Sequence, residues 1–382
     1  MKKVLLVNVL VMLLLRINAQ VMCYSDVSNA TPDSSGSSKS INDLKIVRVN
    51  FHFMQNSSGG GNFRSYDDGD GRPFTGYDYA RQHVEAMNNM SSNNYQLNLT
   101  LGNSIPIIPK NYKFVLDAVY FNPDNAHYNY GTAKFSIYGK DKPNVMNIFI
   151  SYGTLSGGGV ASDLGATYNP SIGKYTDLRS YWYEYINNMN DGFFNDWVRA
   201  TTTSHELGHL LTLKHTVLLG SNIVCPTGCP GSGPIDNTCD DFCADTPAAW
   251  EITTANNCTQ HPSSCAWGGA IAPNCTNNLM DYAGEHALSP CQIGRIHSAL
   301  EGGLKQFLSC YAVGLDQTFC NLSYPKTSYF GKNVIVGNCG TLAHITNKNK
   351  IDLYYSSSVE LNNFEVRADS EFEIILEPVC GF

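Results

Sequence analysis

The sequence has few charged residues, and beyond its N-terminus it has no long hydrophobic run. Charged side chains make up 15% of the 382 residues, against about 25% in an average soluble protein. Asn, Ser, Thr, Gly and Tyr take their place, a composition typical of extracellular surfaces. The net charge of −8 argues against nucleic acid as a partner, because phosphate binding needs a concentrated basic surface. No later segment approaches the ~20 apolar residues of a membrane span, so we expect no transmembrane helix.

The N-terminus has the pattern of an export signal. Lys2 and Lys3 precede an apolar run over residues 4–15, and Ala19 is a small residue suited to cleavage. We therefore expect residues 1–19 to be a signal peptide and the protein to be secreted or held at the cell surface. The alternative is an N-terminal core strand. Residues 20–44 follow as a flexible segment, rich in Ser, Asp, Asn, Gly and Pro.

Cysteine is almost absent from the first half of the chain. Of 13 cysteines only Cys23 precedes Cys225, and twelve late cysteines in an exported protein predict up to six disulfides of undetermined pairing. A zinc ribbon is the alternative for the closely spaced pairs Cys225/Cys229 and Cys239/Cys243. Cys23 could be a thiol without a structural role, a lipidated residue, or a thiolate that blocks a metal before activation.

The apolar share of 43% is enough for a packed core, which rules out a chain disordered throughout. Because a single core stops growing near ~250–300 residues, we expect one large domain at 45–311 and a small β-rich module at 312–382. Apolar periodicity predicts the elements of the large domain. They are strands at residues 46–53, 95–100, 114–120 and 145–152, and helices at 77–90, 197–213 and 290–308.

The most informative stretch is TTTSHELGHLLTLKH at residues 201–215. On a helix, His205 and His209 lie four residues apart on one face, within reach of one metal ion. Glu206 is offset by about 100°, beside the metal, where a general base belongs. His215 would lie about 9 Å further along a straight helix. The helix must therefore stop near Thr212, and the chain must turn back to bring His215 to the metal.

Three imidazoles on one ion leave a fourth position open for water, which is typical of a catalytic zinc site. Zinc lowers the pKa of that water towards ~7 and polarises the carbonyl under attack. Glu206 could then take the proton and pass it to the leaving amine. The alternative is an amphipathic helix with surface histidines and no metal.

These residues resemble a known signature. The stretch is similar to the metzincin motif H-E-x-x-H-x-x-G-x-x-H, and NLMDY at 278–282 is similar to the Met-turn that follows it. With CADTPA at 243–248 and LSPCQIGRIH at 288–297, the chain resembles the pappalysin family of metalloendopeptidases, especially its bacterial cytophagalysin-like branch. The resemblance implies an α+β catalytic domain of two subdomains. The upper one would hold a twisted mixed sheet with a backing helix and the active-site helix, and the lower one would be irregular and disulfide-tied, with the Met-turn and a last long helix.

The resemblance also assigns roles by position. It implies zinc ligands at His205, His209 and His215, a general base at Glu206, and an apolar floor beneath the metal at Met280. Tyr282 matches a tyrosine that stabilises the tetrahedral intermediate; the alternative is an ordinary packed or surface tyrosine.

One position departs from the family pattern. The motif has glycine where this chain has Thr212, and a β-branched residue with positive φ is a genuine outlier. Three outcomes are open: a different turn, a strained site, or a displaced His215.

Further expectations come from the family alone. An exposed edge strand would hold an extended peptide by strand addition, with residues 145–150 as the candidate and an ordinary inner strand as the alternative. Structural calcium could bind the carboxylates of Asp240, Asp241 and Asp245, or the loop carboxylates of Asp67, Asp68 and Asp70, which are otherwise surface turn residues. If Cys23 has a role, the resemblance implies a latency thiolate on zinc; the alternative is a thiol without a function.

We therefore expect a secreted zinc endopeptidase that binds protein or peptide substrates extended in its cleft. The main alternative is a metzincin scaffold whose catalysis has decayed and which acts as a surface binding or adhesion protein. A third reading is a different metal hydrolase acting on a small amide.

Overall fold

The computed structural model describes most of the large domain and of the C-terminal module. The described residues are 43–66, 75–97, 105–129, 131, 134–153, 158–162, 173–179, 181–182, 196–218, 243, 245–246, 249–250, 277–280, 286–337, 339, 343–345, 349–368, 370–377 and 380. The predicted signal peptide, residues 20–42 of the flexible segment with Cys23, the carboxylates of Asp67, Asp68, Asp70, Asp240 and Asp241, and Tyr282 lie outside these residues.

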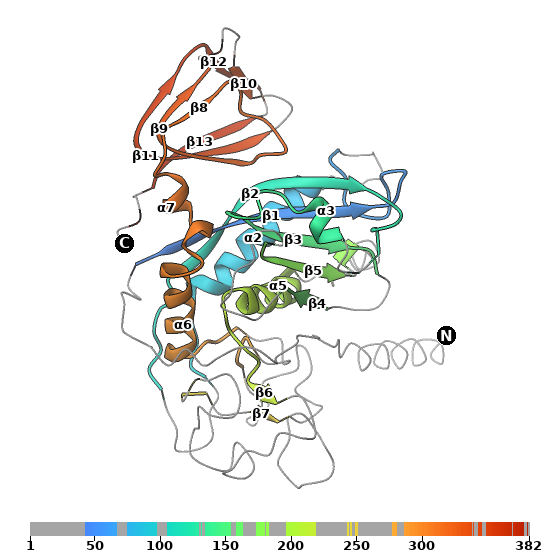
Figure 1. Ribbon diagram of the computed structural model, residues 1–382, viewed down its shortest axis with the longest axis vertical. Coiled ribbons are helices and arrows are strands. Elements are labelled where there is room, and N and C mark those ends of the chain that lie inside the picture. Colours follow the sequence, from blue (N-terminus) through green and yellow to red (C-terminus); the bar gives the residue numbers. More distant parts are fainter. Residues whose placement is uncertain are drawn as a thin grey trace, which may run out of the picture.

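A five-stranded mixed sheet forms the upper part of the large domain (Figure 1). Its strands, in the order β2-β1-β3-β5-β4, are β1 (Lys45–Gln55), β2 (Tyr112–Pro123), β3 (Met146–Ser151), β4 (Gly159–Ala161) and β5 (Tyr175–Arg179). The first four strands in that order are parallel to one another, and β4 pairs antiparallel with β5. The predicted mixed sheet is therefore confirmed, although β4 and β5 were not among the predicted strands.

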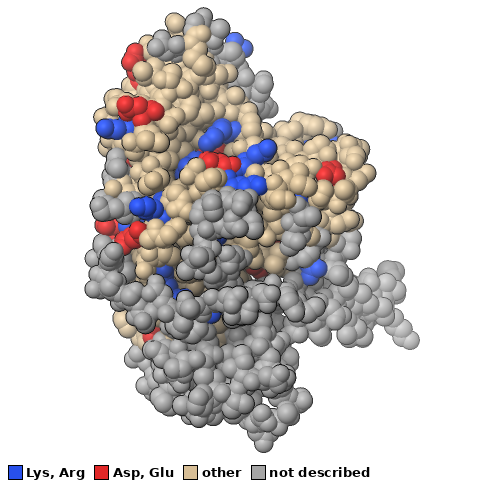
Figure 2. All heavy atoms as spheres, in the orientation of Figure 1, with Lys and Arg blue, Asp and Glu red and all other residues tan. Residues whose placement is uncertain are grey.

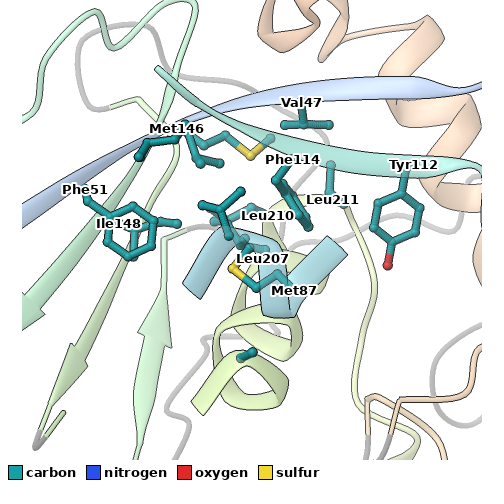
Figure 3. Close-up of a cluster of buried hydrophobic side chains, with 14 of the residues drawn as sticks. Val47, Phe51, Met87, Tyr112, Phe114, Met146, Ile148, Leu207, Leu210 and Leu211 are labelled. Carbon is teal, nitrogen blue, oxygen red and sulfur yellow. The ribbon is translucent and has the colours of Figure 1, made fainter. Parts of the chain in front are cut away.

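Two helices cover one face of this sheet. They are α2 (Gly76–Ser92), which starts with a capping box between Thr75 and Asp78, and α5 (Asp196–Leu210). The odd-numbered residues of β1 point into the core that these helices close, as the period-2 alternation of a strand requires. Figure 3 shows Phe51 and Ile148 from the sheet near Leu207 and Leu210 of α5. This burial fixes α5, the helix that carries the histidine motif, against the sheet.

The opposite face of the sheet is buried too, but it is partly polar. Asn50 and His52 of β1 reach the Asn147 side chain of β3, at 3.4 and 2.8 Å. The short helix α3 (Lys134–Tyr138) adds Phe135, which packs on Phe149. Both faces of the central strands are therefore covered.

The last helix of the large domain is shorter than predicted. Helix α6 (Pro290–Glu301) begins at Ser289 with a capping box to Gln292 and with proline at its first position, as expected. It ends at Gly302 rather than near residue 308, and the chain continues through the 3₁₀ turn η2 (Lys305–Phe307) and α7 (Ser309–Ala312). The predicted strand at 95–100 is wrong over residues 95–97, which lie in no strand.

The C-terminal module is all β in its described part beyond α7. Four strands, β13 (Glu371–Leu376), β11 (Lys350–Leu361), β9 (Ser328–Val336) and β8 (Gln317–Phe319), form one sheet in that order. A second sheet pairs β10 (Ala343–Ile345) with β12 (Phe364–Val366). The module has its own small core, formed by Leu322, Tyr329, Val334, Val336, Ala343, Ile345, Ile351 and Leu353.

The module is docked on the outer edge of β2. Asp117 of β2, only 1% exposed, accepts hydrogen bonds from Arg48 Nη2 at 3.1 Å and from Lys326 Nζ at 2.9 Å. The Arg48 guanidinium also lies over the Phe330 ring, 4.7 Å from its centre, and the Thr327 N–H donates to the Asp117 carbonyl. In Figure 2 charged side chains gather on the visible face where module and sheet domain meet, while most of the coloured surface is uncharged.

Three disulfides join described cysteines: Cys243–Cys291, Cys310–Cys380 and Cys320–Cys339. Cys310 follows α6 and Cys380 lies near the end of the chain, so this bridge also ties the module to the large domain. Since Cys243 is bridged to Cys291, it cannot serve the zinc-ribbon alternative. A two-stranded sheet of β6 (Val217–Leu218) and β7 (Ala249–Trp250) lies below α5 (Figure 1). Among the described helices, none has the length and apolar content that a membrane crossing requires.

Candidate metal centre and active site

Three histidine side chains meet at one point below the sheet. His205 and His209 lie one turn apart on α5, and His215 comes from the chain just after the helix. The His215 Nε2 atom lies 3.0 Å from Nε2 of His205 and 2.9 Å from Nε2 of His209. All three residues are buried. The structure thus brings together the three residues that the sequence singled out as metal ligands.

The hydrogen bonds of Nδ1 in two of the rings determine whether Nε2 of the same ring carries a hydrogen. His205 Nδ1 lies 2.7 Å from the Leu279 carbonyl oxygen, and His209 Nδ1 lies 2.9 Å from the Leu213 carbonyl oxygen. A carbonyl oxygen only accepts, so each Nδ1 must carry the hydrogen. In a neutral ring the Nε2 atom then presents a lone pair, and both lone pairs point towards Nε2 of His215.

This arrangement fits a divalent metal ion. Burial lowers the pKa of His205 to about 4 and that of His209 to about 3, and it lowers the pKa of His215 as well. Neutral imidazoles are the form that binds metal. Tetrahedral zinc with Zn–N bonds of ~2.0–2.1 Å places its ligand nitrogens about 3.3 Å apart, close to the observed spacing. Without a metal, converging lone pairs would repel each other, because the one hydrogen that His215 can direct inward satisfies only one of them.

The turn after α5 explains how His215 reaches the other two rings. The Leu213 N–H donates to the Gly208 carbonyl at 2.9 Å, and the Thr212 N–H donates to the His209 carbonyl at 3.0 Å. This pair of bonds is the Schellman motif, which needs a left-handed residue at the position of Thr212. Thr212 has φ of 76°. Of the three outcomes that the sequence left open, the structure has the strained turn, with His215 in place.

The segment with Met280, the predicted Met-turn, packs directly under the histidine helix. A Cβ atom added at Gly208 would lie 2.7 Å from the sulfur of Met280, so the helix comes this close only because Gly208 has no side chain. Met280 is fully buried, its N–H donates to the Asn278 side chain at 2.8 Å, and its carbonyl accepts from the Thr216 N–H at 3.2 Å. Met280 therefore lies where an apolar floor would be.

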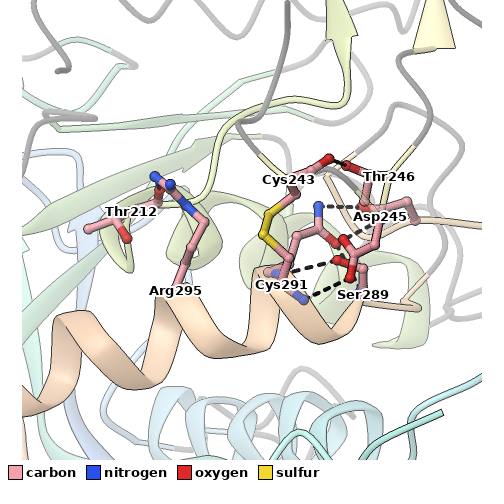
Figure 4. The surroundings of a disulfide bond; sticks show 9 residues. Thr212, Cys243, Asp245, Thr246, Ser289, Cys291 and Arg295 are labelled. Carbon is pink, nitrogen blue, oxygen red and sulfur yellow. Dashed lines mark hydrogen bonds between the residues drawn. A yellow bond between two sulfur atoms is a disulfide. The ribbon is translucent and has the colours of Figure 1, made fainter. Parts of the chain in front are cut away.

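Helix α6 braces this region from the side (Figure 4). Arg295 Nη2 donates to the Thr212 carbonyl at 3.2 Å, which supports the strained turn. At the start of α6, the Cys291 N–H donates to Asp245 Oδ2 at 2.9 Å, next to the Cys243–Cys291 disulfide. Asp245 therefore satisfies an N–H in the first turn of α6, and calcium binding by this residue stays a prediction.

Glu206 is buried at 1% exposure and is directed towards the sheet. Its side chain packs against Gly159 of β4, the last strand of the sheet, because a Cβ atom at Gly159 would lie 2.6 Å from Glu206 Cγ. Tyr282, the other predicted catalytic residue, lies outside the described residues.

The edge strand was assigned to the wrong segment. Residues 145–150 fall almost entirely on β3, which pairs with β1 on one side and β5 on the other. The edge strand next to the histidine helix is β4. Every residue of β3 is buried, and a strand that is buried on both faces is typical of the inside of a sheet. The glycine run that ends at Gly159 carried the missed signal, since glycine in a strand often marks a close approach.

A comparison with models of known protein families finds a match that includes the three histidines. Residues 133–301 match the Peptidase_M43 family model, described as pregnancy-associated plasma protein-A. No curated protein matches the chain.

Two solved structures from Tannerella forsythia show weak similarity. A promirolysin mutant is 14% identical with a TM-score of 0.38, over 70% of this chain and 84% of that one. Mature mirolysin in complex with a cleaved peptide is 12% identical with a TM-score of 0.38, over 69% of this chain and 96% of that one. These values are too low to transfer the role of any residue.

Proposed function

Because residues 133–301 form a domain of the pappalysin family of metallopeptidases, we propose that the protein is a secreted zinc-dependent endopeptidase that hydrolyses internal peptide bonds of proteins. The observation that carries the proposal is the meeting of three buried imidazoles, two of them fixed by backbone carbonyls with their Nε2 lone pairs inward. Such a set suits one zinc ion with a coordination position left open for chemistry.

When bound, zinc would supply a Lewis acid that polarises the scissile carbonyl and lowers the pKa of water. The remaining work falls to side chains of this chain. Glu206 is the general base that takes a proton from the attacking water and returns it to the leaving amine. Its burial between α5 and β4 supports this role, because a carboxylate shielded from bulk water acts on its neighbours more strongly. Tyr282 is proposed to donate a hydrogen bond to the carbonyl oxygen of the substrate.

We propose that the substrate binds as an extended peptide along β4. In the described part of the sheet β4 pairs only with β5, so its other edge has backbone groups that can pair with a peptide strand. Val160 and Ala161 of β4 are partly exposed, and Gly159 of the same strand contacts Glu206. A peptide paired with this edge would pass close to the base and the three histidines.

Secretion is part of the proposal. It is supported by the signal-like residues 1–19 and by three disulfides among the described cysteines, since disulfides persist mainly in oxidising compartments. The peptidase reading is favoured over a decayed binding scaffold because Glu206 is retained next to a complete histidine set.

The test is a cleavage assay with the purified mature chain on two substrates, a denatured protein and a small amide such as an anilide. We expect cleavage of the protein, loss of activity with a zinc chelator, and recovery on adding zinc. Glu206→Gln should retain about one zinc per chain while kcat falls by roughly 10³-fold or more. A zinc-loaded wild-type chain without activity would support the binding scaffold, activity on the small amide alone would support the third reading, and an active Glu206→Gln variant would rule out the proposed base.

A further inference from the structure

Gly159 is the residue of β4 that faces the active-site helix. It is buried and pairs with Leu178 of β5 in the antiparallel register. A Cβ atom at this position would lie 2.6 Å from Cγ and 2.9 Å from Cδ of Glu206, and 2.7 Å from Cδ2 of Leu178. All three distances are shorter than real Cβ contacts, so a side chain here would force its neighbours to move.

Space, not backbone conformation, is what requires glycine here. The positive-φ glycines of the described chain include Gly158 but not Gly159, so alanine could adopt the backbone conformation at residue 159 without strain. Leu178 and Glu206 differ in how easily they could move away from a new side chain. Leu178 offers a terminal methyl group, whereas the Glu206 contact involves the middle of the side chain and the carboxyl carbon itself.

We propose that Gly159 is a positioning residue for Glu206: the missing side chain in β4 sets where the Glu206 carboxylate lies relative to the three histidines. The inference rests on the proposed function, since it deepens the role given to Glu206. A methyl group at residue 159 would displace the Glu206 side chain by about 1 Å to regain a normal contact, and a misplacement of ~1 Å can cost about 10²-fold in rate.

Strand β4 would then have two separate tasks. The outer edge of β4 would pair with substrate, and Gly159 on its inner side would place the base. Substitutions that disrupt peptide pairing at the outer edge of β4 should raise KM. Displacement of Glu206 should instead lower kcat and leave KM unchanged.

The first experiment compares Gly159→Ala with Gly294→Ala. Gly294 lies in α6, and a Cβ atom there would have no neighbour within 4 Å, so this variant controls for the gain of a methyl group. We expect Gly159→Ala to bind one zinc per chain, to keep KM within about twofold, and to lose roughly 10- to 100-fold in kcat. Gly294→Ala should match the wild type. Equal kcat for Gly159→Ala and the wild type would overturn the proposal.

A second variant identifies which neighbour matters. Leu178→Val removes the Cδ2 atom that the new methyl group would meet, so Gly159→Ala combined with Leu178→Val relieves this contact and keeps the two close contacts with Glu206. This double variant should fold even if Gly159→Ala alone does not, and its kcat should stay low. If kcat returns to that of Leu178→Val alone, Gly159 acts through the packing of Leu178, and the proposal is wrong.

A spectroscopic measurement without substrate tests the positioning of Glu206 independently of peptidase activity. In the Co²⁺-loaded protein, visible absorption follows the pH titration of groups at the metal centre without any substrate. Gly159→Ala should shift the apparent pKa of this titration by about half a unit or more, in the same direction as Glu206→Gln. An unshifted titration refutes the placement of Glu206 by Gly159. If the wild type cleaves no protein and yet the shift is present, the proposed function fails and the positioning role stands.

Discussion

The turn that brings His215 to the other histidines has a threonine where glycine fits best, so we expect Thr212→Gly to raise the free energy of unfolding. Thr212 has φ of 76°, and the other non-glycine residues with positive φ in the described chain are Asn111, Asp141 and Asn363. Asn and Asp tolerate this region because their short polar side chains can bond to the nearby backbone. A β-branched residue has no such compensation.

The size of the effect follows from two opposing contributions. A left-handed conformation costs an L-residue roughly 1–2 kcal/mol, and glycine would remove this cost. Glycine also makes the unfolded chain more flexible, which lowers stability by about 0.4–1 kcal/mol. The net gain should be about 0.5–1.5 kcal/mol, equivalent to roughly 1–2 °C in melting temperature for a chain of this size. Thr212→Asn should give a smaller gain.

Thermal and urea unfolding of the metal-free chain measure this difference. Thr212→Ala is the informative comparison, because it removes the branched side chain and keeps the Cβ atom that makes the conformation unfavourable. Asn363→Gly is the control for adding a glycine at a position where Asn already suits the backbone, and it should give no gain. If Thr212→Ala stabilises the chain as much as Thr212→Gly, or if Thr212→Gly destabilises it, strain at this turn is not the reason.

Two further predictions concern stability away from the metal centre. Asp117→Ala removes the buried carboxylate from the Arg48 guanidinium, which keeps only the more exposed Asp141 at 3.5 Å, and should cost up to about 3–5 kcal/mol in urea unfolding. Lys326→Met, at the exposed end of the same network, should cost at most about 1 kcal/mol; equal costs would contradict this picture. Burial lowers the pKa of His52 to about 3. Between pH ~6.5 and 3, His52 therefore stays neutral in the folded state, whereas it is protonated in the unfolded state. Stability should therefore fall as pH drops from ~6.5 towards 3, and His52→Gln should reduce that slope by up to ~1.4 kcal/mol per pH unit in melts between pH 7.5 and 5. Unchanged slopes would show that His52 has the same pKa in the folded and unfolded states.

Local patterns were sufficient to find the histidine set. The spacing of His205 and His209 follows directly from helix geometry, and the length left before His215 required a turn near Thr212. The structure has that turn, with φ at Thr212 in the region that the family glycine would occupy. Capping residues also gave the starts of helices correctly, as at Ser289, because a cap is made within a few residues of sequence.

Non-local pairing was beyond the reach of the same patterns. Alternation predicts a strand but does not reveal its neighbours, so residues 145–150 were assigned to an edge although β3 lies between β1 and β5. The contact between Gly159 and Glu206 joins positions 47 residues apart, and the contact between Asp117 and Lys326 joins positions 209 apart. Such contacts depend on how whole elements pack. The end of α6 was a local error, since Gly302 and Gly303 could have signalled it.

The strained turn at Thr212 is stable because several contacts hold it at once. Its cost of roughly 1–2 kcal/mol is opposed by the burial of Leu213, 1% exposed, which contributes about 1.5–3 kcal/mol. Two Schellman bonds and the Arg295 bond add to this. The Leu213 carbonyl meanwhile fixes the ring of His209. One turn therefore brings in the third histidine and orients the second, and the burial of Leu213 together with these hydrogen bonds offsets the strain at Thr212.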